Sequence, residues 1–309
     1  MAPIEKGKGT ALAYLTALVS GISVFANSFG VLTIDSTAYT FLKNMLVAGI
    51  LAALALSLGS WREFLSLSRK QLLMLAFIGC IGGGAAFALY FAGLALTGGA
   101  AGSFLYRLLF AFAAIIAVGA LKEKFSWQTA LGVIAILAGN YILLGDAALS
   151  LSEGALLVLG ATVLWAAEYA VSKKALEALS PTTVAAARMG IGSLVLLAIL
   201  AYNGKIAALG QVSSASFLWI AIATGFLVLF VTLWYSALKH TSLISATAAF
   251  TLGGPVSALL SFALAGKALL PAQAAGFLVL ALGAVAVVGA SETLSALSWA
   301  RERAQRLRL

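Results

Sequence analysis

Charged residues are scarce in this sequence. Asp, Glu, Lys and Arg together make up 9% of its 309 residues, whereas a soluble globular domain carries roughly 25%. A chain with so few charges cannot cover a surface that faces water. This absence argues against a soluble enzyme, a disordered chain and a nucleic-acid-binding domain.

The residues that build disulfides and metal sites are almost missing as well. Cys80 is the single cysteine and His240 the single histidine, which excludes an internal disulfide, a cysteine-based metal site and a histidine cluster. The chain also contains no phosphate-binding Gly-Lys-Ser/Thr loop, nucleophile elbow or zinc-ligand spacing. We therefore expect neither a cofactor nor an enzymatic activity.

Hydrophobic residues are abundant instead: they make up 62% of the chain, and the mean hydropathy is +1.08. They form solid apolar blocks, unlike the alternating pattern of a membrane β-barrel. A spanning helix needs about 20 apolar residues, and ten such segments predict an all-α membrane protein. The predicted spans are Ala11–Phe29, Thr37–Leu58, Gln71–Leu94, Thr97–Ala120, Trp127–Leu144, Glu153–Ser172, Pro181–Tyr202, Ser214–Leu238, Thr241–Ala265 and Pro271–Ala290.

The basic residues test this count, because cytoplasmic segments of membrane proteins are enriched in Lys and Arg. With the N-terminus inside, the outer segments hold only Lys205 and Lys267, and Lys43, Arg107 and Arg188 fall within spans. All other basic residues lie inside. The pattern predicts an integral membrane protein, of the bacterial inner membrane in our interpretation, with both termini cytoplasmic. The basic tail then indicates attraction to anionic membrane lipid rather than to nucleic acid.

The chain contains an internal repeat. An offset of 144 residues places Tyr90-Phe91 on Trp234-Tyr235 and Gly132 on Gly276, and an offset of 145 places Lys43 on Arg188. Because each repeat holds five spans, an odd number, the second copy enters the membrane from the opposite side. The prediction is two inverted five-helix repeats, residues 1–148 and 149–309, with a substrate site at their interface.

Short motifs carry a family resemblance. Residues 121–132 read LKEKFSWQTALG, and residues 266–276, GKALLPAQAAG, look like a second copy. Together with Trp165-Ala166 and Gly254-Pro255, these motifs resemble the ten-helix EamA-type branch of the drug/metabolite transporter superfamily. The resemblance implies export or exchange of small metabolites, such as amino acids, with the fifth and tenth helices at the periphery.

Polar and aromatic residues within the spans are the candidate substrate-binding residues. Helical spacing places Trp165, Glu168 and Tyr169 on one face of the sixth span, and Ser23 and Asn27 take the matching face of the first span. Aromatic pairs recur at matched positions in the third and eighth spans. The predicted set is Ser23, Asn27, Tyr90, Phe91, Ser103, Arg107, Trp165, Glu168, Tyr169, Trp234 and Tyr235.

Intramembrane charges leave alternatives open. Glu168 is interpreted either as a group that binds a substrate ammonium or carries a coupling proton, or as the partner of Arg107 or another buried cation. Arg107 either grips a substrate carboxylate or forms an internal ion pair. For Lys43 and Arg188 we favour extension of the side chain to the lipid headgroups over a role in gating.

The leading hypothesis is a secondary active transporter, exporter or exchanger, that moves a small metabolite by alternating access. A carrier for organic cations or drugs is the alternative within transport, since aromatic rings and a carboxylate suit such a cargo. An alternative of another class is a non-transporting membrane scaffold. A scaffold would not need polar faces at matched places in both repeats.

Overall fold

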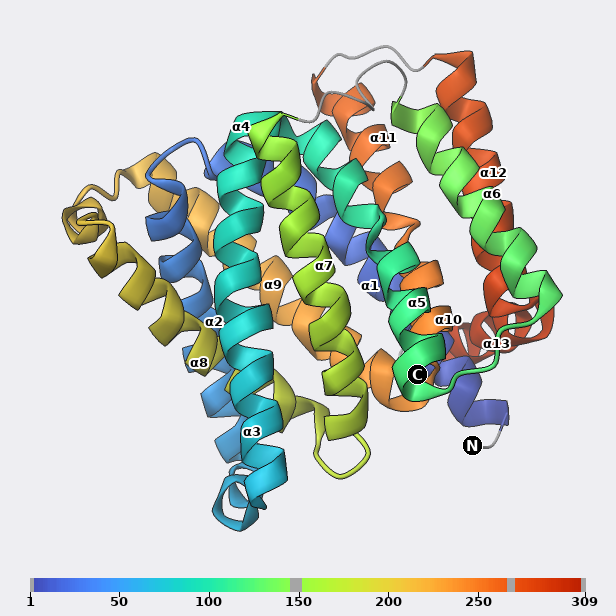
Figure 1. The fold of residues 1–309 in the computed structure, drawn as a ribbon, viewed down its shortest axis with the longest axis horizontal. Helices are drawn as coiled ribbons and strands as arrows, with labels where there is room; N and C mark the ends of the chain where they lie inside the picture. Colours follow the sequence, from blue (N-terminus) through green and yellow to red (C-terminus); the bar gives the residue numbers. More distant parts are fainter. Residues whose placement is uncertain (1–2, 145–151, 266–269, 307–309) are drawn as a thin grey trace.

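The computed structural model describes residues 3–144, 152–265 and 270–306, and in these residues every regular element is helical (Figure 1). The first half contains α1 (Pro3–Gly30), α2 (Ser36–Ser57), η1 (Ser60–Ser66), α3 (Arg69–Phe77), η2 (Ile78–Ala85), α4 (Ala86–Arg107), α5 (Leu109–Leu121) and α6 (Trp127–Leu144). The second half contains α7 (Glu153–Ala175), α8 (Pro181–Tyr202), η4 (Ile206–Gly210), α9 (Ser214–His240), α10 (Leu243–Phe250), α11 (Gly253–Ala265), α12 (Pro271–Val288) and α13 (Ala290–Arg306).

The predicted spans correspond to these helices. Among the described residues, 9 helical stretches are long and apolar enough to cross a membrane, and Trp127–Leu143 forms a shorter apolar helix. The predicted ten-helix, all-α architecture is confirmed. The predicted boundary between residues 148 and 149 lies outside the described residues, as does Lys267.

The helices begin where the sequence offers an N-cap. Ser180 accepts a hydrogen bond from the Thr183 N–H, and Pro181 occupies the first turn of α8, where its missing N–H costs nothing. Ser152 caps α7 in the same way through the Ala155 N–H. Because these caps satisfy backbone donors that the helix itself leaves unpaired, the two helices start at the predicted residues.

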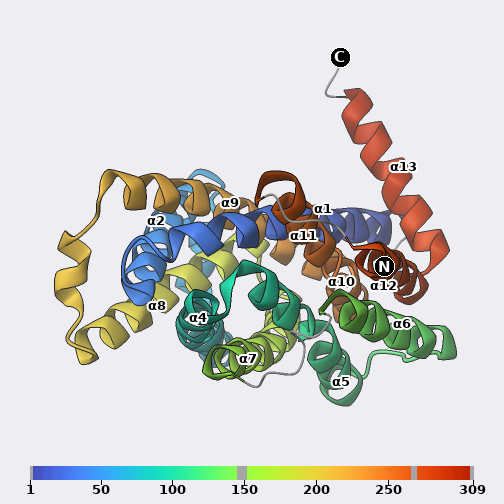
Figure 2. The ribbon, with the colours of Figure 1, turned by 90° about the horizontal axis from the view of Figure 1, so that it is seen from above.

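One helix lies beyond the predicted spans. Gly289, with φ of 91°, ends α12 in a conformation that glycine adopts without strain. The basic tail then continues as α13, which projects away from the bundle (Figure 2). The Tyr14 hydroxyl lies 3.2 Å from the Thr293 hydroxyl, so α13 packs against the N-terminal part of α1.

Contacts between helices of the first half and helices of the second half come in matching pairs, in which the two halves exchange roles. α1 packs against α9, and the matching pair α7 and α4 packs in the same way. α2 contacts α8, its own counterpart, and α6 contacts α12. Both figures place α6 and α12 side by side at one edge of the bundle (Figures 1 and 2). This is the packing expected of two repeats related by a pseudo-twofold axis, with the fifth and tenth spans peripheral.

Glycines make the contact between α6 and α12 possible. A Cβ added at Gly132 would lie 2.8 Å from the Gly283 carbonyl oxygen, and one added at Gly139 would lie 2.7 Å from that of Gly276. An offset of 144 residues places Gly132 on Gly276 and Gly139 on Gly283, so the two contacts are equivalent under the internal repeat. Small residues that allow close backbone approach are typical of membrane helix interfaces.

The fourth and ninth spans are both broken at matched positions. α4 gives way to α5 at Leu108, and α10 gives way to α11 between Phe250 and Gly253. The break in the ninth span comes directly before Gly253-Gly254-Pro255, which begin α11, and the first repeat breaks without a proline. Broken helices in corresponding positions of inverted repeats commonly border the substrate site of a transporter.

Candidate functional site

A π-helical segment in the third span shapes the centre of the bundle. η2 contains three consecutive glycines, Gly82 to Gly84, and its wider turn exposes carbonyl groups that an α-helix would use internally. The Gly82 carbonyl accepts hydrogen bonds from Trp165 Nε1 at 2.9 Å and from Arg188 Nη2 at 3.2 Å. A Cβ at Gly82 would overlap the Glu168 side chain. The glycine run therefore brings α7 and α8 against the third span.

A small cavity lies between the repeats. Its volume is about 50 Å³, which holds a few waters or a carboxylate group, whereas ligand pockets reach about 300–1,000 Å³. Helices α1, α2 and α4 of the first repeat and α7, α8 and α9 of the second supply its walls. The lining residues are Ser20, Ser23, Val24, Asn27, Lys43, Phe87, Tyr90, Phe91, Tyr106, Trp165, Arg188, Leu227 and Phe230.

Five of the predicted binding residues line this cavity: Ser23, Asn27, Tyr90, Phe91 and Trp165. Neighbouring side chains position several of them. Asn27 donates to the Ser23 hydroxyl at 3.1 Å. The rings of Tyr90 and Trp165 lie 5.2 Å apart. The cavity thus has an aromatic wall and a polar wall, from different helices.

Glu168 faces inward but does not line the cavity. It is fully buried, and its Oε2 lies 3.4 Å from Arg188 Nη2. Its Oε1 accepts hydrogen bonds from Ser172 and, at 2.9 Å, from Tyr235. Of the predicted partners, Arg107 is therefore wrong and another intramembrane cation is right. That cation is Arg188, which lies on α8, the next helix along the chain.

Arg107 ties the two broken spans together instead of reaching the cavity. Its Nη1 donates to the Phe250 carbonyl at 3.1 Å, its Nη2 donates to Ser20 Oγ at 3.3 Å, and its guanidinium carbon lies 4.4 Å from the Phe250 ring centroid. Phe250 is the last residue of α10, where a cation is favourable because the helix dipole is negative there. Among the described residues no carboxylate forms the expected ion pair with Arg107, and Arg107 is not one of the residues that line the cavity. The side chain of its predicted neighbour Ser103 lies outside the described part of the structure.

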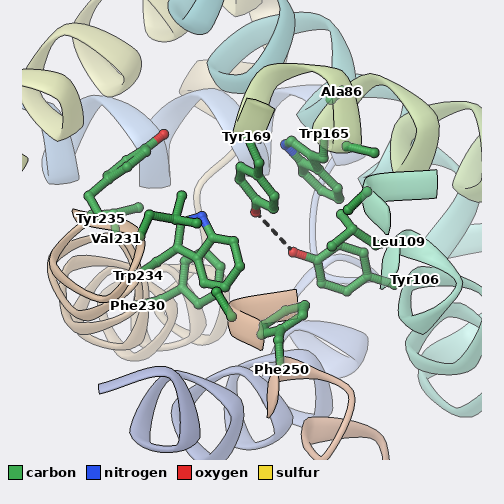
Figure 3. Close-up of a cluster of buried hydrophobic side chains, with 14 of the residues drawn as sticks. Ala86, Tyr106, Leu109, Trp165, Tyr169, Phe230, Val231, Trp234, Tyr235 and Phe250 are labelled. Carbon is green, nitrogen blue, oxygen red and sulfur yellow. Dashed lines mark hydrogen bonds between the residues drawn. The ribbon is translucent and has the colours of Figure 1, made fainter. Parts of the chain in front are cut away.

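Tyr169, Trp234 and Tyr235 do not line the cavity; they belong to a buried cluster that also contains the lining residues Tyr106, Trp165 and Phe230 (Figure 3). The Tyr169 and Tyr106 hydroxyls lie 3.5 Å apart, and the Tyr169 and Trp234 rings are 4.6 Å apart. Trp234 in turn packs on Phe250, with 5.3 Å between ring centroids. In this conformation these predicted residues support the lining; a direct contact with substrate stays a prediction.

The expectation that the Lys43 and Arg188 side chains extend to the lipid headgroups is wrong. Each side chain is 1% exposed, and both line the cavity, so neither extends to the lipid headgroups. Lys43 Nζ lies 3.5 Å from the Phe91 ring centroid and donates to Asn27 Oδ1 at 3.3 Å. The signal that could have found them was present: both are cations in matched positions within spans, and such charges usually face a cavity.

Comparison with known proteins agrees with the fold. The EamA-like transporter family matches the chain twice, over residues 7–145 and 152–289, so the chain belongs to this family. A solved structure described as "Crystal structure of protein" is similar, with 18% identity, a TM-score of 0.71, and coverage of 90% of this chain and 94% of that chain. No curated protein sequence matches.

Family membership gives the broad class. The chain is an integral membrane protein of the drug/metabolite transporter type, and members of its family are transporters rather than enzymes. A transporter of this family is embedded in a membrane and has a small-molecule substrate. The solved structure supports the fold alone, since its sequence identity is low.

Proposed function

We propose that this protein is a secondary active transporter that exports or exchanges small amphipathic metabolites, amino acids among them, by alternating access. One observation carries the proposal: residues of both repeats line a single cavity that has polar and aromatic walls. A substrate site at the interface of inverted repeats is the arrangement that alternating access uses. A scaffold would gain nothing from such a cavity.

Polar contacts join neighbouring segments on both predicted sides of the membrane. On the predicted outer side, Lys205 Nζ lies 2.7 Å from Asp35 Oδ2. On the predicted inner side, Glu123 accepts hydrogen bonds from the N–H groups of Leu243 and Ile244. Because a cavity of about 50 Å³ cannot hold a whole amino acid, transport requires one end to open and the cavity to widen.

Glu168 is our candidate for a coupling proton. It is the one acid that is fully buried among the described residues, and its partner Arg188 lines the cavity. Protonation of Glu168 would remove the counter-charge of Arg188 and so change the charge at the cavity wall. This links proton binding to substrate binding without direct contact between Glu168 and the substrate.

The proposal is tested by flux into proteoliposomes across a panel of amino acids, carboxylates, amines and quaternary ammonium compounds. We expect saturable flux of at least one compound above that of protein-free vesicles. Absence of flux for all of them, with and without a pH gradient, would favour the scaffold. For the proton, Glu168→Gln should abolish the effect of an imposed pH gradient, whereas Glu168→Asp should retain it.

An organic-cation carrier is less well supported. Its cargo would need the Glu168 carboxylate, which Arg188, Ser172 and Tyr235 already occupy. Preferential flux of quaternary ammonium compounds in the same panel would favour the organic-cation carrier over the metabolite transporter.

The location in a bacterial inner membrane, with cytoplasmic termini, also belongs to the proposal. Labelling of cysteines introduced near either end, in intact cells, tests it.

A further inference from the structure

The buried charges of this protein do not balance. Among the described residues, the buried charged side chains are Lys43, Arg107, Arg188 and Glu168, so three cations face one carboxylate. Glu168 is taken by Arg188. Charges within the hydrocarbon region are costly unless they are compensated, and an uncompensated cation at a cavity wall favours an anion inside the cavity.

Lys43 is the cation that stands at that wall. Its ammonium has three donors and, among the described residues, one hydrogen-bond acceptor, Asn27 Oδ1 at 3.3 Å. That oxygen also accepts from the Tyr39 hydroxyl at 2.9 Å. No carboxylate lies within 4.0 Å of Lys43 in the described residues, where the rings of Phe91, Phe87 and Tyr39 surround it.

Arg188 brings a second set of donors to the same space. Its Nη2 holds Glu168 and the Gly82 carbonyl, while its Nε and Nη1 are buried without a hydrogen-bond partner. Both cations line the same cavity and lie near the same ring, because the Phe87 centroid is 5.5 Å from Lys43 Nζ and 5.1 Å from the Arg188 guanidinium carbon. Lys43 and Arg188 therefore belong to one site.

Hydrogen bonding leads to the same conclusion as charge. The buried side-chain atoms of the lining that lack a partner are Tyr90 Oη, Arg188 Nε and Arg188 Nη1, and each can donate. Apart from the tyrosine hydroxyls, which can also accept, the side-chain acceptors of the lining are in use: Asn27 Oδ1 accepts two bonds, and the Ser20 and Ser23 hydroxyls accept one each. A buried donor without an acceptor is costly, so a cargo that supplies acceptors fits this cavity.

We infer that the cargo is an amphipathic carboxylate, whose carboxylate group binds Lys43 and Arg188 and whose apolar body lies against Phe87, Tyr90, Phe91 and Trp165. A substrate ammonium finds no free anion there. This inference rests on the proposed transport function and narrows it: among metabolites of similar shape, the deaminated acid is preferred to the amino acid and to the amine.

Matched sets of compounds test the inference by equilibrium binding to the protein in lipid nanodiscs. 3-Phenylpropanoate, phenylalanine and phenethylamine share one body, and 4-methylpentanoate, leucine and 3-methylbutylamine share another. We expect the acid of at least one set to bind at least 10-fold more tightly than its amine and more tightly than its amino acid. Equal or tighter binding of the amino acid or the amine, or no binding of either acid at millimolar concentration, overturns the inference.

Variants of Lys43 assign the effect to this site. Lys43→Met should weaken binding of the acid by 10-fold or more, and Lys43→Arg should retain most of it. Replacing a buried charge by an apolar residue of similar size usually preserves folding, and the melting temperature of each variant checks this. Lys174→Met, at an exposed position on α7, is the control and should bind as the wild type does. Unchanged binding by a folded Lys43→Met protein contradicts the inference.

Flux measurements separate this inference from the proposed function. Binding of an acid without protein-dependent flux would support the site chemistry and contradict transport. Flux of an amine or an amino acid in preference to the acid would support transport and contradict the site chemistry. Protein-free vesicles are the reference, because the neutral form of a small acid crosses a bilayer unaided.

Discussion

Glu168 on α7 and Arg188 on α8 form an ion pair inside the bundle, with 3.4 Å between Oε2 and Nη2 and both side chains at most 1% exposed. The pair stands beside the carbonyl group of Gly82, which also accepts a hydrogen bond from Arg188. The Arg188 guanidinium thus joins the sixth and seventh spans to the π-helical segment of the third span. We therefore expect the loss of this ion pair to lower the stability of the protein, whatever its effect on transport.

Removing one member of this pair should destabilise the protein more than removing both. Glu168→Gln leaves Arg188 buried without a counter-charge, and such losses cost about 3–5 kcal/mol. The double variant Glu168→Gln, Arg188→Met should recover much of that loss because no charge remains unpaired. Unfolding in detergent, followed by tryptophan fluorescence, measures the difference. A double variant less stable than Glu168→Gln alone would show that the pair is not the cause.

The ion pair between Asp35 and Lys205 should make a small contribution to stability that depends on pH. Burial acts to raise the pKa of Asp35, but the Lys205 ammonium and the N–H groups of Thr37 and Ala38 outweigh it and lower that pKa. The contribution is therefore present above the pKa of an unfolded aspartate, about 3.9, and is lost as the pH falls through the lower folded value.

Lys205→Met tests that sign. Because Lys205 is 53% exposed, we expect a loss of less than about 1 kcal/mol at pH 7, shrinking as the pH approaches 3. Asp35→Asn should cost a similar amount while it preserves the N-cap of α2, whereas Asp35→Ala should cost about 1 kcal/mol more. A stability difference between wild type and Lys205→Met that grows on acidification would contradict this account.

Alanine at Gly132 or Gly283 should separate α6 from α12. The added Cβ would lie 2.6 Å from Val287 Cγ2 in the first case and 2.7 Å from the Ile136 backbone nitrogen in the second. We expect each substitution to cost about 1–3 kcal/mol through overpacking, with similar effects because the two sites face each other. Gly225→Ala is the matched control, since nothing lies within 4 Å of its Cβ; thermal melts in detergent compare the three.

Glu123, in the segment between α5 and α6, should act as an N-terminal cap of α10. Its two carboxylate oxygens accept hydrogen bonds from the Leu243 N–H at 2.7 Å and the Ile244 N–H at 3.0 Å, at the start of α10. Glu123→Ala should cost about 0.5–2 kcal/mol, as the loss of an N-cap does, and Glu123→Gln less, because one oxygen remains. Lys124→Ala, at the next position, should leave the melting temperature unchanged. Equal melting of Glu123→Ala and wild type would rule out the cap.

The number, type and order of the spans could be predicted because they depend on local properties. Length and hydropathy define a spanning helix, and the starts at Glu153 and Pro181 follow from Ser152 and Ser180 as caps. The distribution of Lys and Arg predicts the orientation. The offset of 144 residues predicted the repeats, which the packing of Gly132 on Gly283 and of Gly139 on Gly276 reproduces in space.

The candidate site could be predicted only in part. Helical spacing placed Ser23, Asn27 and Trp165 on inward faces, and all of them line the cavity. The position of Lys43 along its helix misled the prediction, because a cation near the end of a span extends to the headgroups as readily as it turns inward. A residue's own helix does not specify which neighbour receives its side chain.

That the chain is a helical membrane protein with two related halves follows from the sequence alone, since apolar length, cap residues and charge asymmetry act within a few residues along the chain. Only the folded structure shows that Glu168 pairs with Arg188, that Arg107 binds the end of α10, and that Lys43 lines the cavity. These outcomes depend on how helices from different parts of the chain rotate and approach one another, and glycines such as Gly82 set that approach.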